Sequence, residues 1–317
     1  MPSPTSLVTG GAGFIGSNLV DALLARGDRV VILDNLTTGR RSNLDQAIEL
    51  GAELIDVDVR DSEAVLEVFT EQRPSTVFHL AAQIDVRLSV ERPGYDAIVN
   101  VAGTANLLEA NRLTENARFV LASTGGAIYG EGAGQMLPLS EDTPVRPLSP
   151  YGQSKFAAEG YLSLYRQLHE SNCVALRFGN VYGPRQDPLG EAGVIAIFCR
   201  LLAEEARPTV YGSGHQTRDY VYVADVIDAM LAAGGSRAKG PLNIGTGVET
   251  SVLALVEGLA KRSGSEDFKP RFAPPRVGEV DRISLDPTRA RSELGWSAKV
   301  GLDRGLAETL ASIESAP

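Results

Sequence analysis

The sequence predicts an α/β fold in which a doubly wound parallel sheet is covered by helices on both faces. Short runs rich in Val, Ile and Leu alternate with helix-length segments through the first half of the chain. The runs are apolar on both faces, which is typical of strands buried in a parallel sheet. A glycine triplet between the first strand and the first helix is also typical of this fold.

The expected elements alternate from the beginning of the chain. Strands are expected over residues 6–9, 29–33, 53–57, 76–80, 118–123 and 173–178, and helices over residues 14–26, 43–50, 62–72, 95–111 and 150–170. After residue 177 glycine and proline become frequent, and the expected elements are strands over 208–212 and 219–223 and helices over 252–262 and 287–294. We therefore expect a nucleotide-binding domain of residues 1–178 and a smaller α+β substrate-binding region of residues 179–317, with the chain crossing back between them.

Composition excludes several classes of protein. The 317 residues suffice for two domains, and 30 Lys and Arg against 40 Asp and Glu give a net charge of −10. This charge repels nucleic acid and acidic membranes, so we expect neither as a partner. Cys173 and Cys199 lie in apolar runs and are expected to be buried thiols in a reducing, cytoplasmic compartment. The three histidines lie in different elements, so no metal site is expected.

The glycine triplet predicts a dinucleotide site. Gly10, Gly13 and Gly16 have the spacing G-x-x-G-x-x-G between a strand and a helix. This order leaves free N–H groups at a helix N-terminus, where a pyrophosphate binds. A tight turn alone, which is the alternative, would need only one or two glycines.

Carboxylates follow the next two strands. Asp34 lies 18 residues after Gly16, where an acid accepts hydrogen bonds from the adenosine ribose and repels a 2′-phosphate. NAD is therefore expected rather than NADP, although Arg40 and Arg41 nearby could attract that phosphate. Asp58 either accepts from the adenine amino group or caps the helix that follows it.

A tyrosine and a lysine are the candidate catalytic pair. Tyr151 and Lys155 are four residues apart, which places both on one face of a helix. Ser149 is the expected N-cap and Pro150 the first helical residue, so Tyr151 lies at the positive end of the helix dipole. A phenol with a pKa of about 10 becomes a base when an ammonium group and this dipole stabilise its anion. A surface pair is the alternative, and the glycine triplet earlier in the chain favours catalysis.

Together these motifs resemble the extended short-chain dehydrogenases/reductases of Rossmann fold, and among them the nucleotide-sugar epimerases and dehydratases that include the UDP-hexose 4-epimerases. The similar segments include VTGGAGFIGSNL, DNLTTG, FHLAAQ, NVAGT, STGGAIYGE, SPYGQSK, LRFGNVYGPRQ, TRDYVYVADV and LNIGTG. The resemblance implies a bound NAD contacted by Gly10, Gly13, Phe14, Ile15, Gly16, Asp34, Asn35, Thr38, Gly39, Asp58, Val59, Leu80, Ala81, Ala82, Asn100, Tyr151, Lys155 and Phe178.

The family also implies a catalytic hydroxyl beside the Tyr–Lys pair. Its usual position, four residues before Tyr129, is Gly125 in this sequence. We expect Thr124 to replace it, brought in by a bend at Gly125 and Gly126, with Ser123 as the alternative. The turn also carries glycine and alanine where dehydratases of the family have an Asp–Glu pair. Reversible hydride transfer without elimination, which is epimerisation, is therefore expected.

The resemblance implies a UDP-hexose substrate held by Asn180, Tyr211, Arg218, Arg276, Glu279 and Ile283. Ile283 is expected to flank the hexose, where a Tyr in the family excludes N-acetyl sugars. UDP-glucose and UDP-galactose are thus the expected best substrates, with slower turnover of UDP-N-acetylglucosamine. Uronates are disfavoured because Asp187 and Glu191 are expected near the sugar, although Arg185 could offset them.

The sequence leaves other functions open. The enzyme alternatives are a UDP-N-acetylglucosamine or UDP-glucuronate 4-epimerase, and a UDP-sugar dehydratase, decarboxylase or dehydrogenase. A non-catalytic NAD-sensing protein is a further alternative, which the presence of the Tyr–Lys pair disfavours. Proteins of the family are often homodimers, so a homodimer is expected.

Overall fold

The computed structural model describes residues 3–131, 136–189, 193–265, 267–275 and 280–315. Its centre is a seven-stranded sheet in the order β11-β6-β5-β4-β1-β2-β3, in which all neighbours are parallel. The strands are β1 Thr5–Thr9, β2 Arg29–Leu33, β3 Glu53–Ile55, β4 Thr76–His79, β5 Arg118–Thr124, β6 Cys173–Phe178 and β11 Gly240–Ile244. The predicted doubly wound fold is confirmed. The strand order reverses between β1 and β4, and ligands of such sheets bind beyond the carboxyl ends of the strands at this point.

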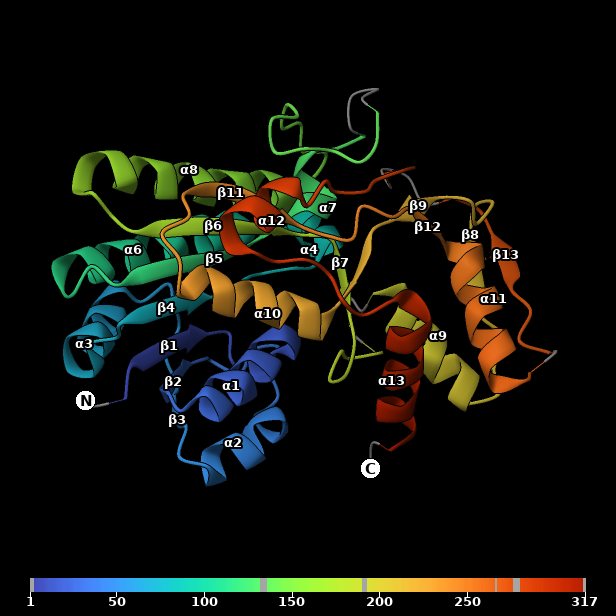
Figure 1. The fold of residues 1–317 in the computed structure, drawn as a ribbon, viewed down its shortest axis with the longest axis horizontal. Helices are drawn as coiled ribbons and strands as arrows, with labels where there is room; N and C mark the ends of the chain where they lie inside the picture. Colours follow the sequence, from blue (N-terminus) through green and yellow to red (C-terminus); the bar gives the residue numbers. More distant parts are fainter. Residues whose placement is uncertain (1–2, 132–135, 190–192, 266, 276–279, 316–317) are drawn as a thin grey trace.

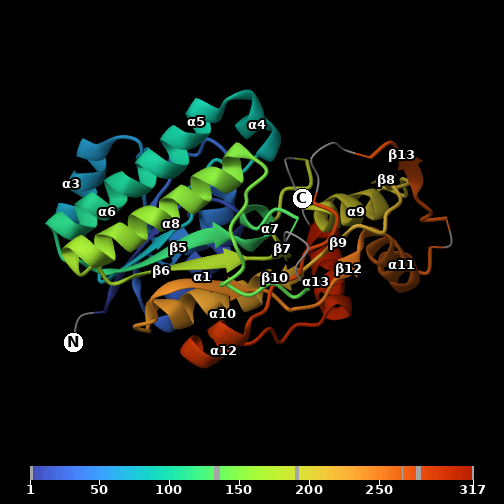
Figure 2. The ribbon, with the colours of Figure 1, turned by 90° about the horizontal axis from the view of Figure 1, so that it is seen from above.

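Helices cover both faces of the sheet (Figures 1 and 2). On one face, α3 (Ser62–Gln72), α6 (Gly103–Leu113) and α8 (Pro150–His169) pack through a core that includes Phe69, Leu107 and Leu162. On the other face, α1 (Phe14–Arg26) and α10 (Val223–Gly234) pack through Leu19, Leu23 and Met230. Each face is closed by its own hydrophobic cluster, as expected for strands apolar on both sides.

The smaller region lies beyond the carboxyl ends of the strands (Figure 1). It contains β7 (Asn180–Tyr182), α9 (Val194–Ala203), β8 (Thr209–Tyr211), β9 (Thr217–Arg218), β10 (Tyr220–Tyr222), β12 (Thr250–Ser251), α11 (Val252–Ser263), β13 (Arg271–Ala273) and α13 (Leu302–Glu314). Its strands form two-stranded pairs β7–β10, β8–β13 and β9–β12. The chain returns to the sheet between these elements, because α10 and β11 follow β10, and α12 (Thr288–Leu294) also packs on β11.

Several elements differ from the sequence-based expectation, which also lacked the helices α9, α10 and α13. The expected strands did not include β11, since its first residues, Gly240 and Pro241, are typical of a turn. Proline is tolerated there because β11 is an edge strand. The expected helix over 95–111 is preceded by α4 (Val86–Glu91), begins as α5 (Pro93–Ala97) and passes through a π-helical turn, Ile98–Ala102, before α6.

The expected helix over 43–50 is shorter than predicted. A 3₁₀ turn, Arg41–Leu44, comes first, and α2 covers Asp45–Glu49. Cys173 and Cys199 are free and buried, as predicted. None of the helices in the described part of the chain is long and apolar enough to cross a membrane.

Candidate active site

The glycine turn between β1 and α1 has both structural and ligand-binding features. Gly10 has a φ of +71°, and a Cβ there would lie 2.6 Å from Ala81 N; a Cβ on Gly16 would lie 2.1 Å from Gly10 O. The fold itself requires these two glycines. A Cβ on Gly13 would meet only Gly10 O, at 3.3 Å. The absence of a side chain at Gly13 therefore keeps the N-terminus of α1 open, which favours a pyrophosphate site over a simple tight turn.

Asp34 lies at the end of β2 beside this turn. Its Oδ2 accepts a hydrogen bond from Ala12 N at 2.9 Å, and its Oδ1 accepts one from Leu36 N at 2.8 Å. The side chain at position 39 must be absent here, because a Cβ on Gly39 would lie 3.1 Å from Asp34 Oδ1 and 2.7 Å from Ala12 Cβ. These contacts fix the carboxylate next to the open end of α1, where an adenosine ribose would follow the pyrophosphate.

Asp58 takes part in a small polar cluster at the same edge of the sheet. It accepts a hydrogen bond from Asn35 Nδ2 at 2.7 Å and pairs with Arg60 at 2.6 Å. The Arg60 guanidinium is the largest influence on this carboxyl, whose pKa falls to about 2. The alternative role as a helix cap is wrong, because Asp61 caps α3 by accepting from Glu63 N at 3.2 Å.

The other expected cofactor residues gather at the carboxyl ends of the central strands. Phe14 and Ile15 begin α1, Leu80, Ala81 and Ala82 follow β4, and Phe178 ends β6; Thr38 precedes Gly39, and Val59 follows Asp58.

Asn100 is held by several buried hydrogen bonds. Its side chain is buried in the π-helical turn, where Oδ1 accepts from Gln83 N at 2.8 Å and Nδ2 donates to Gln83 O at 2.9 Å and to Ser154 Oγ at 3.0 Å. Nδ2 also lies 3.2 Å from Asp96 Oδ1. The amide is thus occupied in joining the loop after β4 to α8, beside Lys155. These bonds position Asn100, and its contact with the cofactor stays a prediction.

The start of α8 is formed as the sequence predicts. Ser149 Oγ accepts from Gly152 N at 3.1 Å, and Pro150 is the first helical residue. Gly152 allows α8 to approach the one-turn helix α7 (Gly125–Ile128), because a Cβ there would lie 2.6 Å from Ala127 O. Tyr151 therefore lies in the first turn of α8, at the positive end of its dipole and next to the end of β5.

Burial dominates the electrostatics of the catalytic pair. It raises the pKa of Tyr151 to about 12, against the hydrogen-bond contact with the Thr124 hydroxyl, and the buried Asp96 raises this pKa further. Burial also lowers the pKa of Lys155 to about 8, against the nearby carboxylates of Glu159 and Asp96. The expected depression of the Tyr151 pKa is therefore not present in the protein alone. Tyr151 is neutral at pH 7, and Lys155 is largely protonated.

The structure distinguishes the two candidate hydroxyls. Ser123 Oγ donates to Glu159 Oε1 at 2.6 Å and is held on the buried side of β5. Thr124 is the residue in contact with Tyr151. The expected bend at Gly125 has a different cause, because a Cβ on Gly125 would lie 2.4 Å from Leu285 Cδ1. Gly125 is needed so that the fully buried Leu285 can pack against α7.

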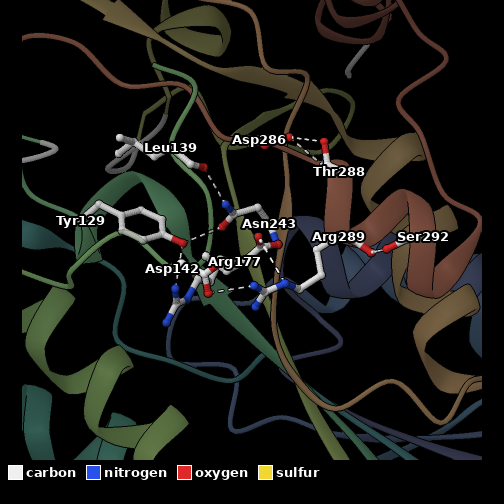
Figure 3. Close-up of polar contacts among 10 residues, drawn as sticks. Tyr129, Leu139, Asp142, Arg177, Asn243, Asp286, Thr288, Arg289 and Ser292 are labelled. Atoms are coloured by element: carbon white, nitrogen blue, oxygen red, sulfur yellow. Dashed lines mark hydrogen bonds and ion pairs between the residues drawn. The ribbon is translucent and has the colours of Figure 1, made fainter. Parts of the chain in front are cut away.

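A buried polar network connects α8, which carries the candidate catalytic residues, to the central sheet. Glu159 of α8 pairs with Arg177 of β6 at 2.6 Å, and Arg177 Nη1 donates to the Tyr129 hydroxyl at 2.7 Å. The Tyr129 hydroxyl donates in turn to Asn243 Oδ1 of β11 at 2.8 Å, and Asn243 Nδ2 donates to Leu139 O at 2.9 Å (Figure 3). The network connects α8, two strands and the segment that contains Leu139.

That segment also holds the chain near Ile283. Leu139 N donates to Ser284 O at 2.8 Å, and Asp286 N donates to Leu139 O at 2.8 Å. On its outer side, Arg289 of α12 bonds to Asp142 at 2.9 Å (Figure 3). The segment that contains Ile283, which was expected to contact the substrate, is thereby attached to the sheet.

Three of the described substrate candidates come from different elements, β7, β8 and β9. A Cβ on Gly126 would lie 3.4 Å from Asn180 Oδ1, so the Asn180 amide faces the turn that follows Thr124. Arg218 Nη1 donates to Thr217 O at 2.8 Å, and Tyr211 is partly exposed at the end of β8. Arg276, Glu279 and Glu191 lie outside the described residues.

Sequence reasoning missed Asp219, although it lies within the motif TRDYVYVADV. Asp219 is 1% exposed and accepts four hydrogen bonds, from Thr246 N (2.8 Å), Thr246 Oγ1 (2.6 Å), Gly247 N (3.0 Å) and Leu285 N (3.0 Å). Its backbone carbonyl accepts from Asn180 N at 2.7 Å. Asp219 thus joins β7, the loop after β11 and the segment that contains Ile283.

Two expectations about the sugar end are corrected. Ile283 is 1% exposed and packs with Ile128, Tyr129 and Leu139, so its side chain belongs to a hydrophobic cluster and does not line an open site. Replacement of Ile283 by Tyr would overpack this cluster.

Asp187 and Arg185 are also placed differently from the expectation. Asp187 pairs with Arg40, in the loop that follows Asp34, at 2.7 Å, and Arg185 pairs with Asp21 of α1 at 2.7 Å. The two pairs hold Asp187 against the loop after β2 and Arg185 against α1, and the Arg40 guanidinium offsets the charge with which Asp187 was expected to repel a uronate. Arg40 is likewise paired with a carboxylate, which weakens its case as a 2′-phosphate ligand.

Comparison with known proteins agrees with this geometry. The profile of the family described as GDP-mannose 4,6 dehydratase matches residues 7–309. The chain belongs to this family. It is 48% identical to a UDP-glucose 4-epimerase from Mycolicibacterium smegmatis, over 96% of this chain and 97% of that protein.

Solved structures of the family are also similar. UDP-glucose 4-epimerase from Thermotoga maritima, crystallised with UDP-glucose, superposes with a TM-score of 0.93 at 41% identity, over 97% of this chain and 98% of that one. The Thermus thermophilus UDP-glucose 4-epimerase in complex with NAD has a TM-score of 0.92 at 45% identity, over 99% and 100% of the two chains.

In the described residues, no group of three or more His, Cys, Asp or Glu could hold a metal ion.

We expect the two neighbouring hydroxyls to respond differently to substitution. Thr124→Val should lower kcat by about 10²-fold or more with little loss of stability, because Thr124 is the hydroxyl that faces Tyr151. Ser123→Ala should destabilise the protein by about 1–3 kcal/mol, because a buried Glu159 oxygen loses a donor. Steady-state kinetics and urea unfolding measure the two effects. The reverse pattern would assign the catalytic role to Ser123.

Asp219→Asn should destabilise the protein by about 2–4 kcal/mol, because its amide group would face backbone N–H donors. Asp286→Asn is the matched control, since Asp286 is in the same segment and accepts only local hydrogen bonds from Thr288 in the described structure. Urea unfolding of both variants measures the difference. Equal losses would show that Asp219 has no special role in holding this segment.

Proposed function

We propose that this protein is an NAD-dependent 4-epimerase that interconverts UDP-glucose and UDP-galactose. The observation that carries the proposal is the arrangement of Tyr151, Lys155 and Thr124 next to the glycine turn, at the carboxyl ends of the central strands. The similarity to UDP-glucose 4-epimerases over nearly the whole chain supports it.

The residues present fit NAD. The space kept open at Gly13 and the free N–H groups of α1 suit a pyrophosphate, and Asp34 beside them suits an unphosphorylated ribose. Lys155, on the same helix face as Tyr151, would hold the nicotinamide ribose. When bound, NAD accepts a hydride from carbon 4 of the sugar and returns it to the opposite face.

The protein's own residues handle the proton of the sugar. Tyr151 takes up the proton of the 4-hydroxyl and later returns it, and the Thr124 hydroxyl holds the same oxygen in place. The high pKa of Tyr151 must fall for this role, and the Lys155 ammonium and the positive end of α8 favour the phenolate. Because the proton and the hydride both return to the sugar, the reaction needs no external acid or reductant.

The turn after Thr124 favours epimerisation over elimination. Residues Gly125, Gly126 and Ala127 carry no acid or base, and the space next to Gly125 is filled by Leu285. Loss of water or of carbon dioxide from the 4-keto sugar would need such a group. Hydride transfer in both directions is the chemistry that remains.

We also propose that the protein is a cytoplasmic homodimer with α8 in its interface. Phe156, Gly160, Leu164 and Leu168 recur every four residues and lie exposed along one side of α8. An interior helical glycine costs about 1 kcal/mol relative to alanine, and in the described part of the chain a Cβ at Gly160 would meet nothing within 4 Å apart from the neighbouring backbone of its own helix. Close approach of a second copy accounts for the glycine and the apolar stripe together. The free, buried thiols support a reducing compartment.

Incubation with UDP-glucose tests the activity directly. We expect NMR to show conversion to UDP-galactose without loss of water or carbon dioxide and without accumulation of NADH. Tyr151→Phe should lower kcat by about 10²–10⁴-fold while NAD binding is retained, because the hydroxyl acts on the sugar. Exclusive turnover of UDP-glucuronate, or a stable product formed by loss of water from the sugar, would overturn the proposal.

Leu164→Glu should convert the dimer to a monomer, because a charge would be buried in the apolar stripe. Phe272→Glu is the matched control, since Phe272 is 62% exposed but lies on β13, away from α8. Sedimentation velocity measures the mass of each variant. A wild-type monomer, or dissociation by the control alone, would place the interface elsewhere or exclude it.

A further inference from the structure

Residues 183–187, which follow β7, have an unusual backbone conformation. Gly183 has a φ of +146° and Arg185 a φ of +70°. A left-handed conformation is uncommon for arginine and persists only where surrounding contacts hold it. Residues 183–187 are held by contacts on two sides.

On one side the segment is attached to α1. Asn18 Nδ2 donates to Pro184 O at 3.2 Å, and Arg185 Nη2 pairs with Asp21 Oδ2 at 2.7 Å. Asn18 and Asp21 follow Phe14, the first residue of α1, by four and seven positions, so they share one face of the helix. This end of the segment is fixed within two turns of the N-terminus of α1.

On the other side the segment is attached to the loop after β2. Asp187 Oδ2 pairs with Arg40 Nη2 at 2.7 Å. The backbone at Arg40 is itself next to the glycine turn, because Arg40 N donates to Ala12 O at 3.0 Å. The segment is therefore attached both to α1, which begins at the glycine turn, and to Arg40, whose backbone is bonded to that turn.

We propose that residues 183–187 are a cofactor clasp, which spans the crevice over bound NAD and slows its release through the pairs Arg40–Asp187 and Arg185–Asp21. The inference rests on the proposed function, because that function supplies NAD as the bound molecule. An epimerase regenerates NAD within each cycle, so slow release costs it no turnover. The clasp also gives a role to four charged residues, Arg40, Asp187, Arg185 and Asp21, that neither the catalytic chemistry nor the sugar site uses.

The expected effect of each pair is modest. The Arg40 and Asp187 side chains are 55% and 40% exposed, and an ion pair at that exposure contributes about 0.2–1 kcal/mol. Loss of one pair should thus speed NAD release by about 1.4- to 5-fold. The difference is small but lies within the precision of a rate measurement.

Simple attraction between Arg40 and the cofactor makes the opposite prediction for Asp187. NAD is anionic, so removal of a nearby negative charge should slow its release if the charges act on NAD directly. If they act through the clasp, both Asp187→Asn and Arg40→Ala should speed release. The sign of the Asp187→Asn effect therefore distinguishes the two explanations.

The experiment measures loss of radiolabelled NAD from the holoprotein after a chase with excess unlabelled NAD. We expect Asp187→Asn, Arg40→Ala and the double variant to release NAD at similarly increased rates, because either substitution breaks the same pair. The charge swap Arg40→Asp with Asp187→Arg should restore slow release. Arg41→Ala is the matched control, which removes the same charge from the neighbouring residue and should leave the rate unchanged.

Slower or unchanged release from Asp187→Asn would overturn the clasp, as would an equal effect of Arg41→Ala. Salt should speed release from the wild type more than from the double variant. Failure of the proposed function would be distinguishable, since a protein that retains no NAD at all gives no signal in any variant.

Discussion

The buried ion pair between Glu159 and Arg177 is the constraint on which the geometry of the candidate active site depends. Two charges at 8% and 4% side-chain exposure are costly unless hydrogen bonds satisfy them. Here the guanidinium donates to both carboxylate oxygens and to Tyr129, and the carboxylate also accepts from Ser123. Because Glu159 is one helical turn beyond Lys155, this pair fixes how α8 lies on the sheet.

That placement explains why a neutral tyrosine and a lysine of reduced basicity occupy the reaction site. With α8 fixed on β5 and β6, Tyr151 and Lys155 are both buried, and burial shifts both pKa values toward the uncharged forms. The protein therefore maintains a site in which added positive charge has a large effect, since the interior screens charges weakly. Catalysis then depends on what the site binds as much as on the residues that line it.

Much of the sheet and the catalytic helix could be predicted from the sequence. Buried parallel strands are apolar throughout, and the Ser149–Pro150 start of α8 is a local signal, so both are visible in short windows. The strand β11 was missed because its Gly–Pro start is locally a turn, and only its neighbour β6 makes it a strand. The tie between Tyr129 and Asn243 joins residues 114 positions apart, and no spacing rule reveals such a contact.

The site residues show the same difference between features set by the local sequence and features set by contacts distant in sequence. Tyr151 was predicted as a catalytic residue from the sequence of its own helix, and the structure places it in the first turn of α8, as expected. Asn100 and Ile283 were assigned through the family alone, and their side chains are directed into the protein. Asp187 was expected near the sugar from its position in the chain, whereas its partner Arg40 lies 147 residues away. A residue type indicates what a side chain can bind, but its direction depends on contacts that are distant in sequence.

The contact between Gly125 and Leu285 has a consequence for how this protein can diverge from its relatives. A hydroxyl-bearing side chain at position 125 and a leucine at position 285 compete for one volume, so position 125 can gain a side chain only if residue 285 moves or becomes smaller. Leu285 N is bonded to Asp219, which limits how far the leucine can retreat. Natural sequences should therefore show a reciprocal size rule: a serine at 125 with a small residue at 285, or a glycine at 125 with a large one. The turn after Thr124 and the segment that contains Leu285 should therefore change together in evolution.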